Sequence, residues 1–162
     1  MKNGKIFVDK SNNLVGLTYT PDINIDYYTY IKKKLELGYR QFIVTSDMMI
    51  RIVERLCIYR NFDINKIELL EEDDNQQTIL SEYIKLTREN KAYFYKLMEE
   101  LNFIRQESSV DIKRVSFKGR SKNGNFLRFY IQVNGIYGVD DEFFKEETEE
   151  IIKILRGYID NE

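Results

Sequence analysis

Short segments in which hydrophobic and polar positions alternate predict six β-strands. The first two are separated by Ser11-Asn12-Asn13, which favours a hairpin. The last two are joined by a loop that contains Asn123-Gly124, a strong turn signal, so we expect a second hairpin over residues 112–130. The predicted strands are residues 5–9, 14–19, 39–44, 66–70, 112–119 and 126–133.

Hydrophobic positions that recur every three or four residues predict four helices. The longest, over residues 75–104, would reach about 44 Å, which exceeds the width of a domain of this size. We therefore expect it to bend at its polar interruption Thr87–Lys91, to protrude, or to pack on a partner such as a second copy of the chain. The predicted helices are residues 25–37, 45–56, 75–104 and 141–158.

The order of these elements, β-β-α-β-α-β-α-β-β-α, predicts a single α+β domain over residues 1–162. Residues 1–74 supply a hairpin and two βα units, and residues 75–162 supply the long helix, a second hairpin and a C-terminal helix. The 43% hydrophobic and 32% charged residues are typical of a folded domain rather than a disordered chain. We expect a mixed sheet of about six strands with about four helices packed against it.

The composition excludes several kinds of active site. The chain has no histidine, so it cannot build a Ser-His-Asp triad, a Cys-His pair or an ordinary zinc centre. Its one cysteine, Cys57, cannot form an internal disulfide, which favours a reducing cytoplasm. No stretch approaches the length of an apolar membrane span, so we expect no membrane segment. The composition favours a non-enzymatic protein without a cofactor, and any catalysis would use carboxylates and Mg²⁺.

Carboxylates at strand ends and in the first helix are the candidates for such catalysis. Side chains at strand ends can converge on one crevice, and converging carboxylates bind Mg²⁺. An aspartate after a strand is also a common helix cap, so we expect caps and turns and keep the metal site as the alternative. The catalytic candidates are Asp9, Asp26, Asp47 and Asp74, and the metal candidates are Asp9, Asp47 and Asp73.

Two passages resemble the ribonuclease H fold. Phe7-Val8-Asp9 is similar to the end of that family's first strand, and residues 35–47 are similar to its passage from helix to strand to aspartate. The resemblance covers the N-terminal half of the chain and implies a Mg²⁺-dependent nuclease. The sequence departs from the family pattern at Lys10, where a glycine usually stands, and at Ile79, where the last catalytic aspartate falls. The third strand of the family's opening meander is also missing.

The second predicted hairpin is rich in basic and aromatic residues, the types that neutralise phosphates and stack on bases. Alternation along the strand places Val115 and Phe117 on one face and the charges on the other. Two interpretations stay open: the aromatic rings stack on bases, or they lie in the core and only the charges meet phosphates or an acidic protein. The candidate binding residues are Lys113, Arg114, Lys118, Arg120, Lys122 and Arg128.

A third candidate is the start of the second helix. Thr45, Ser46 and Asp47 stand at a predicted helix N-terminus, a position that attracts anions, and Ser46 is the expected N-cap. The three residues are therefore predicted to line a candidate ligand crevice. The glycine-rich loop typical of nucleotide sites is not present beside them.

The distribution of charge favours docking over chemistry. The formal net charge is −2, but successive blocks of the chain, residues 1–60, 61–110, 111–140 and 141–162, carry +4, −5, +4 and −5. Such segregation is typical of a small intracellular interaction protein, an adaptor, regulator or inhibitor that binds a protein or nucleoprotein partner. The alternatives are a nucleic-acid-binding protein that uses hairpin 112–130 and a Mg²⁺-dependent nuclease.

Overall fold

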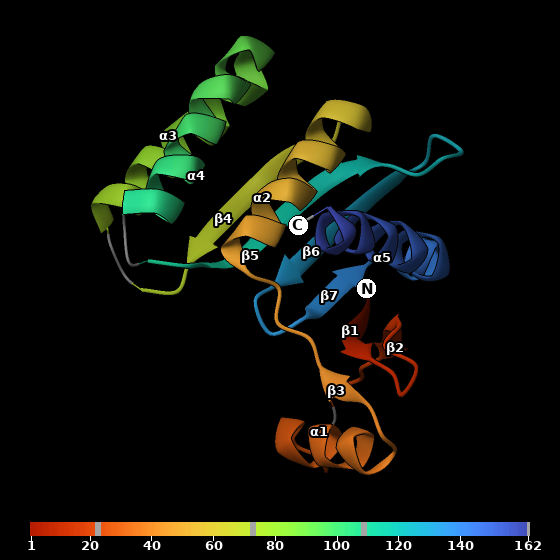
Figure 1. Cartoon of the computed structure of the whole chain (residues 1–162). Coiled ribbons are helices and arrows are strands. Elements are labelled where there is room, and N and C mark those ends of the chain that lie inside the picture. The colour runs from red at the N-terminus through yellow and green to blue at the C-terminus, as the bar shows by residue number, and fades with distance from the viewer. Residues whose placement is uncertain (22–23, 72–73, 108–109, 162) are drawn as a thin grey trace.

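The computed structural model describes residues 1–21, 24–71, 74–107 and 110–161 and is shown in Figure 1. Seven strands and five α-helices make up these segments. The strands are β1 (Lys2–Val8), β2 (Leu14–Thr18), β3 (Arg40–Gln41), β4 (Asp63–Leu69), β5 (Ile112–Arg120), β6 (Phe126–Gln132) and β7 (Ile136–Val139). The helices are α1 (Tyr27–Glu36), α2 (Ser46–Glu54), α3 (Asp74–Glu89), α4 (Phe94–Glu107) and α5 (Phe144–Asp160). The predicted α+β class is confirmed, with one strand and one helix more than expected.

The strands form one sheet in the order β2-β1-β7-β6-β5-β4, and β3 pairs with β1 beyond the end of β7. Every pairing in the described residues is antiparallel, so the prediction of a mixed sheet is wrong. The two predicted βα units do not form parallel crossovers because β3 is only two residues long and β4 lies at the far edge of the sheet.

Strand β7 was not predicted, and it joins the two halves of the sheet. It follows β6 through a tight turn in which Gly135 has φ +83°, a conformation that glycine adopts without steric cost. It then pairs with β6 on one side and β1 on the other. The N-terminal and C-terminal hairpins therefore belong to one sheet.

The predicted helix over residues 75–104 is two helices. Asn90 leaves the helical conformation with φ −149° and ψ 112°, and its side chain accepts a hydrogen bond from the backbone N–H of Ala92. Helices α3 and α4 then pack side by side as a hairpin (Figure 1). The break falls within the predicted interruption Thr87–Lys91. Self-association through residues 75–104 was predicted because one helix of that span would be too long for the domain. The two shorter helices remove that reason.

Side chains of α3 close the edge of the sheet at β4. The Gln77 amide donates to the carbonyl of Ile67 and accepts from the N–H of Leu69, while Arg88 donates to the carbonyls of Ile64 and Asn65. An edge strand with unpaired backbone groups invites pairing with another chain. The α3–α4 hairpin therefore protects this edge.

Helices α2 and α5 cover one face of the sheet, the viewer's side in Figure 1. The rings of Phe117, Phe129, Tyr137 and Phe144 follow one another through the core at centroid distances of 6.1, 6.5 and 5.7 Å. Gly16 leaves room for Tyr137, because a Cβ there would lie 2.4 Å from its hydroxyl oxygen. No helix of the described residues has the length and apolar content needed to cross a membrane.

In the part of the chain that the structure describes, the other face of the sheet is covered only near β1. There Phe7 packs against Tyr30 and Tyr39, and the fully buried Lys5 places its ammonium 5.6 Å from the Phe7 ring centroid and 5.7 Å from that of Tyr27. Burial lowers the pKa of Lys5 to about 8. Helix α1 thus covers the β1 end of this face.

Candidate nucleic-acid interface

The remainder of that second face is formed by the β5–β6 hairpin and by the edge strand β4, whose Glu68 lies opposite Arg114 with its carboxylate 3.8 Å from the Arg114 Nε. Alternation sends Phe117 and Phe129 into the core and turns the intervening side chains outward. The strand register places Lys118 opposite Arg128 and Arg120 opposite Phe126. We call the outward-pointing set the open face: Arg114, Ser116, Lys118, Arg120, Phe126, Arg128, Tyr130 and Gln132.

Two arginine–aromatic stacks are the main feature of the open face. The guanidinium carbon of Arg114 lies 3.7 Å from the ring centroid of Tyr130, and that of Arg120 lies 4.0 Å from the ring centroid of Phe126. The Phe126 side chain is 75% exposed, an unusual cost for a large apolar ring. Planar cations on aromatic rings make a surface on which further flat groups can stack.

Other contacts hold these side chains in place. The Tyr130 hydroxyl donates to the side-chain oxygen of Asn3 at 2.6 Å, and Arg120 donates to the carbonyl of Gly124 at 2.8 Å. Burial raises the pKa of Tyr130, so its hydroxyl stays protonated at neutral pH. The open face is therefore a largely preformed surface.

The centre of the open face carries two cations side by side. Lys118 and Arg128 are directly opposite each other on β5 and β6, an arrangement that destabilises a sheet unless an anion offsets it. Asp140 pairs with Arg128 at 2.8 Å. For Lys118 no ion pair is found within the described residues. Asp63 of β4 lies opposite Lys118 in the strand register, so an external anion bound at this lysine would compete with a carboxylate of the chain.

A groove of about 590 Å³ runs along this end of the open face. Four basic side chains line it, together with the exposed ring of Phe126 and the carboxylates of Asp63 and Asp140. The basic residues of the groove are Arg60, Lys118, Arg120 and Arg128.

Arg60 is fixed by the most buried ion pair in the described structure. Its two terminal nitrogens each lie 2.7 Å from one carboxylate oxygen of Glu147 on α5, and Glu147 is 1% exposed. This hydrogen bonding raises the pKa of Arg60. Arg60 also donates to the carbonyl of Arg120 at 3.1 Å. The pair therefore connects the core helix α5 to the end of β5.

Two of the six predicted binding residues lie outside the open face. Lys122, in the loop between the strands, pairs with Glu150 of α5 at 2.8 Å, and this hydrogen bond raises the pKa of Lys122. Lys113 is an exposed extra residue at a bulge, where the register with β4 shifts between Arg114 and Ile112. The other four, Arg114, Lys118, Arg120 and Arg128, lie together.

Neither aromatic alternative from the sequence holds for the whole hairpin. Phe117 and Phe129 are core residues, whereas Phe126 and Tyr130 share the face of the charges. The alternation along β6 carries this signal: because Phe129 points into the core, Phe126 and Tyr130, at positions of opposite parity, point outward.

The predicted acidic candidates are distributed among separate turns. Asp9 accepts the N–H groups of Ser11 and Asn13 in the β1–β2 turn, both at 2.9 Å. Asp26 caps α1 by accepting the N–H of Thr29, and this bond lowers the pKa of Asp26.

The remaining acidic candidates also have local positions. Asp47 pairs with Arg105 at 3.0 Å, Asp74 is the first residue of α3, and Asp73 lies outside the described residues. Within the segments that the structure describes, no three acidic or sulfur side chains are grouped so that they could hold a metal ion. The structure thus places Asp9, Asp26, Asp47 and Asp74 at separate positions and does not group them at one crevice.

The predicted anion crevice at the start of α2 is filled from within the chain. Thr45, not Ser46, is the N-cap and accepts the N–H of Met48. The Ser46 hydroxyl donates to Asp111 and accepts the N–H of Ile112 at 3.0 Å. Thr45 and Ser46 thus make hydrogen bonds within the fold, whereas the buried Oδ1 of Asp47 has the ion pair with Arg105 and no hydrogen bond.

Comparison of this chain with protein-family models, with curated proteins and with solved structures finds no match.

Proposed function

We propose that this chain is a non-enzymatic cytoplasmic binding module that holds a single-stranded nucleic acid, free or within a nucleoprotein, on its open face. The observation that carries the proposal is the pair of stacks, Arg114 on Tyr130 and Arg120 on Phe126, with Lys118 between them on β5. Stacking on rings or guanidinium planes combined with phosphate neutralisation is how proteins bind single strands.

The dimensions of the open face support a single strand. Strands β5 and β6 run for nine and seven residues, so at about 3.3 Å per residue they offer a surface about 23–30 Å long. This length suits several splayed nucleotides, within the site sizes of about 4–16 nucleotides typical of small binding folds. A duplex would present its phosphates to the cations but would keep its bases from the rings.

Charge elsewhere on the chain supports a localised contact. Helix α5 begins with an acidic first turn that contains Glu146, and the net charge of −2 gives no general attraction to polyanions. Binding would therefore depend on the open face and not on the charge of the whole protein.

The test is a fluorescence-anisotropy titration of the full chain with a labelled 12-nucleotide single strand, its duplex and polyglutamate of matched charge. We expect the single strand to bind most tightly. The logarithm of its binding constant should fall against the logarithm of salt concentration with a slope of about −2, from three phosphate contacts at about −0.7 each. Equal binding of the duplex would refute the stacking role. Tighter binding of polyglutamate would identify an acidic protein as the partner class and refute the proposal.

A further inference from the structure

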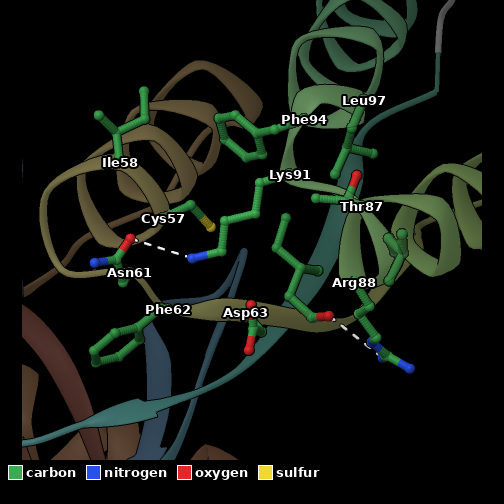
Figure 2. Close-up of a pocket in the computed structure, with 12 residues that line it drawn as sticks. Cys57, Ile58, Asn61, Phe62, Asp63, Thr87, Arg88, Lys91, Phe94 and Leu97 are labelled. Atoms are coloured by element: carbon green, nitrogen blue, oxygen red, sulfur yellow. Dashed lines mark hydrogen bonds between the residues drawn. The ribbon is translucent and has the colours of Figure 1, made fainter.

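A second cavity, of about 230 Å³, lies where the turn between α3 and α4 meets the end of the segment after α2 (Figure 2). Its walls are mainly apolar and come from this segment, β4, α3 and α4. The apolar wall residues are Ile58, Phe62, Ile64, Ile84, Phe94 and Leu97.

The backbone around this cavity departs from regular structure in two places. Residues Arg55–Tyr59 form a π-helical turn, and Asn61 has φ +55°, in the left-handed region. π-helical turns and such backbone conformations are enriched at functional sites because they cost stability. In Figure 2 the π-helical turn directs the sulfur of Cys57 into the cavity and leaves Ile58, which is 57% exposed, beside it.

One cation at the cavity has no ion pair with any of the described residues. The Lys91 ammonium lies 3.2 Å from the side-chain oxygen of Asn61, which is a neutral acceptor, and no ion pair of Lys91 is found in the described part of the chain. Arg88 is already used, since it donates to the carbonyls of Ile64 and Asn65. Lys91 is therefore the group that can turn towards a ligand.

We propose that this cavity binds a small amphiphilic monoanion, with its apolar body between the hydrophobic walls and its carboxylate on Lys91. A dry cavity of about 150 Å³ accommodates benzene, so this cavity accommodates an apolar body somewhat larger, such as a chain of about eight carbons. A carboxylate offers Lys91 a charge-assisted hydrogen bond that the Asn61 amide cannot match. Asp63 also lines the cavity, and its negative charge repels an anion. Removing this charge should therefore strengthen the binding of an anion, whereas removing the charge of Lys91 should weaken it.

The probes are octanoate, octanol and octylamine, which share one apolar chain and differ in the charge of the head group. Binding is measured by calorimetry and by protection of Cys57, the only thiol of the chain, from N-ethylmaleimide. Burial raises the pKa of the Cys57 thiol to about 12, so its reaction is slow and depends on access. We expect octanoate to bind most tightly and to slow the modification of Cys57.

Two charge-neutralising variants define the head-group contact. Lys91→Gln should weaken octanoate about tenfold and leave octanol within about twofold. Asp63→Asn should strengthen octanoate and weaken octylamine, and Lys85→Gln, an exposed position on α3, is the control that should change neither. The proposal is overturned if octylamine binds more tightly than octanoate, if Lys91→Gln weakens octanol equally, or if no probe protects Cys57.

Discussion

Replacement of Glu147 by glutamine is expected to lower the free energy of unfolding by about 3–5 kcal/mol. The substitution keeps the shape of the side chain but leaves the Arg60 guanidinium, which makes two 2.7 Å contacts with Glu147, without its nearest counter-charge; the Glu147 side chain is 2% exposed and that of Arg60 is 19% exposed. An unpaired buried charge costs far more than an exposed ion pair contributes. Because a whole domain is stable by only about 5–15 kcal/mol, this loss is a large part of the total.

The measurement is urea unfolding followed by circular dichroism, with the midpoint and slope compared between variants. The control is Glu149→Gln, an exposed position two residues further along α5, which should change stability by no more than about 0.5 kcal/mol. The double replacement Arg60→Met and Glu147→Leu should recover most of the loss, since apolar pairs often replace buried ion pairs at little cost. Equal effects of Glu147→Gln and Glu149→Gln would contradict the structural role given to this pair.

Reversal of two charges on the open face is expected to weaken single-strand binding about 100-fold or more. Lys118→Glu with Arg120→Glu removes two phosphate contacts, each worth about 1.5–3 kcal/mol as a charge-assisted hydrogen bond, and adds repulsion. It also removes the guanidinium from the stack on Phe126. The measurement is the anisotropy titration with the 12-nucleotide single strand.

Two control variants test whether the loss of affinity comes from the open face itself. One reproduces the change in net charge elsewhere, and the other changes a different part of the same hairpin. Lys32→Glu with Lys33→Glu makes the same change in net charge at exposed positions on α1 and should alter affinity less than about threefold, because the charge lies far from the contact. Lys122→Gln lies in the same hairpin but pairs with Glu150 of α5, so it should also have little effect. If the α1 variant weakens binding as much as the β5 variant, the open face is not the contact surface.

The strands that could be predicted from the sequence are those with sustained alternation. The predicted segments 112–119 and 126–133 differ from β5 and β6 by one residue at most. Strand β7 gives no such signal, because Ile136–Val139 is short, contains Gly138 and is buried on both faces. Its position between β1 and β6 is a property of the assembled sheet, and β7 pairs antiparallel with both neighbours.

The candidate site could be predicted only in part. Alternation identified the cations on β5, but it does not say that Lys122 turns towards Glu150, because loop direction depends on the position of α5. The Arg60–Glu147 pair joins residues 87 positions apart and has one local signal, an acidic residue within the buried stripe of α5 that contains Ile151 and Leu155. The acidic candidates occupy separate places: Asp9 and Asp26 accept backbone N–H groups of their own turn or helix, and Asp47 pairs with Arg105 of α4.

The most direct test of the open face is a map of amide chemical shifts of the isotopically labelled full chain at increasing concentrations of the 12-nucleotide single strand. The proposal predicts that the largest changes occur on β5 and β6, around Lys118, Arg120, Phe126 and Tyr130, and that the amides of α5 change little. Changes concentrated on α2 and α5, or an unchanged spectrum at saturating oligonucleotide, would contradict it.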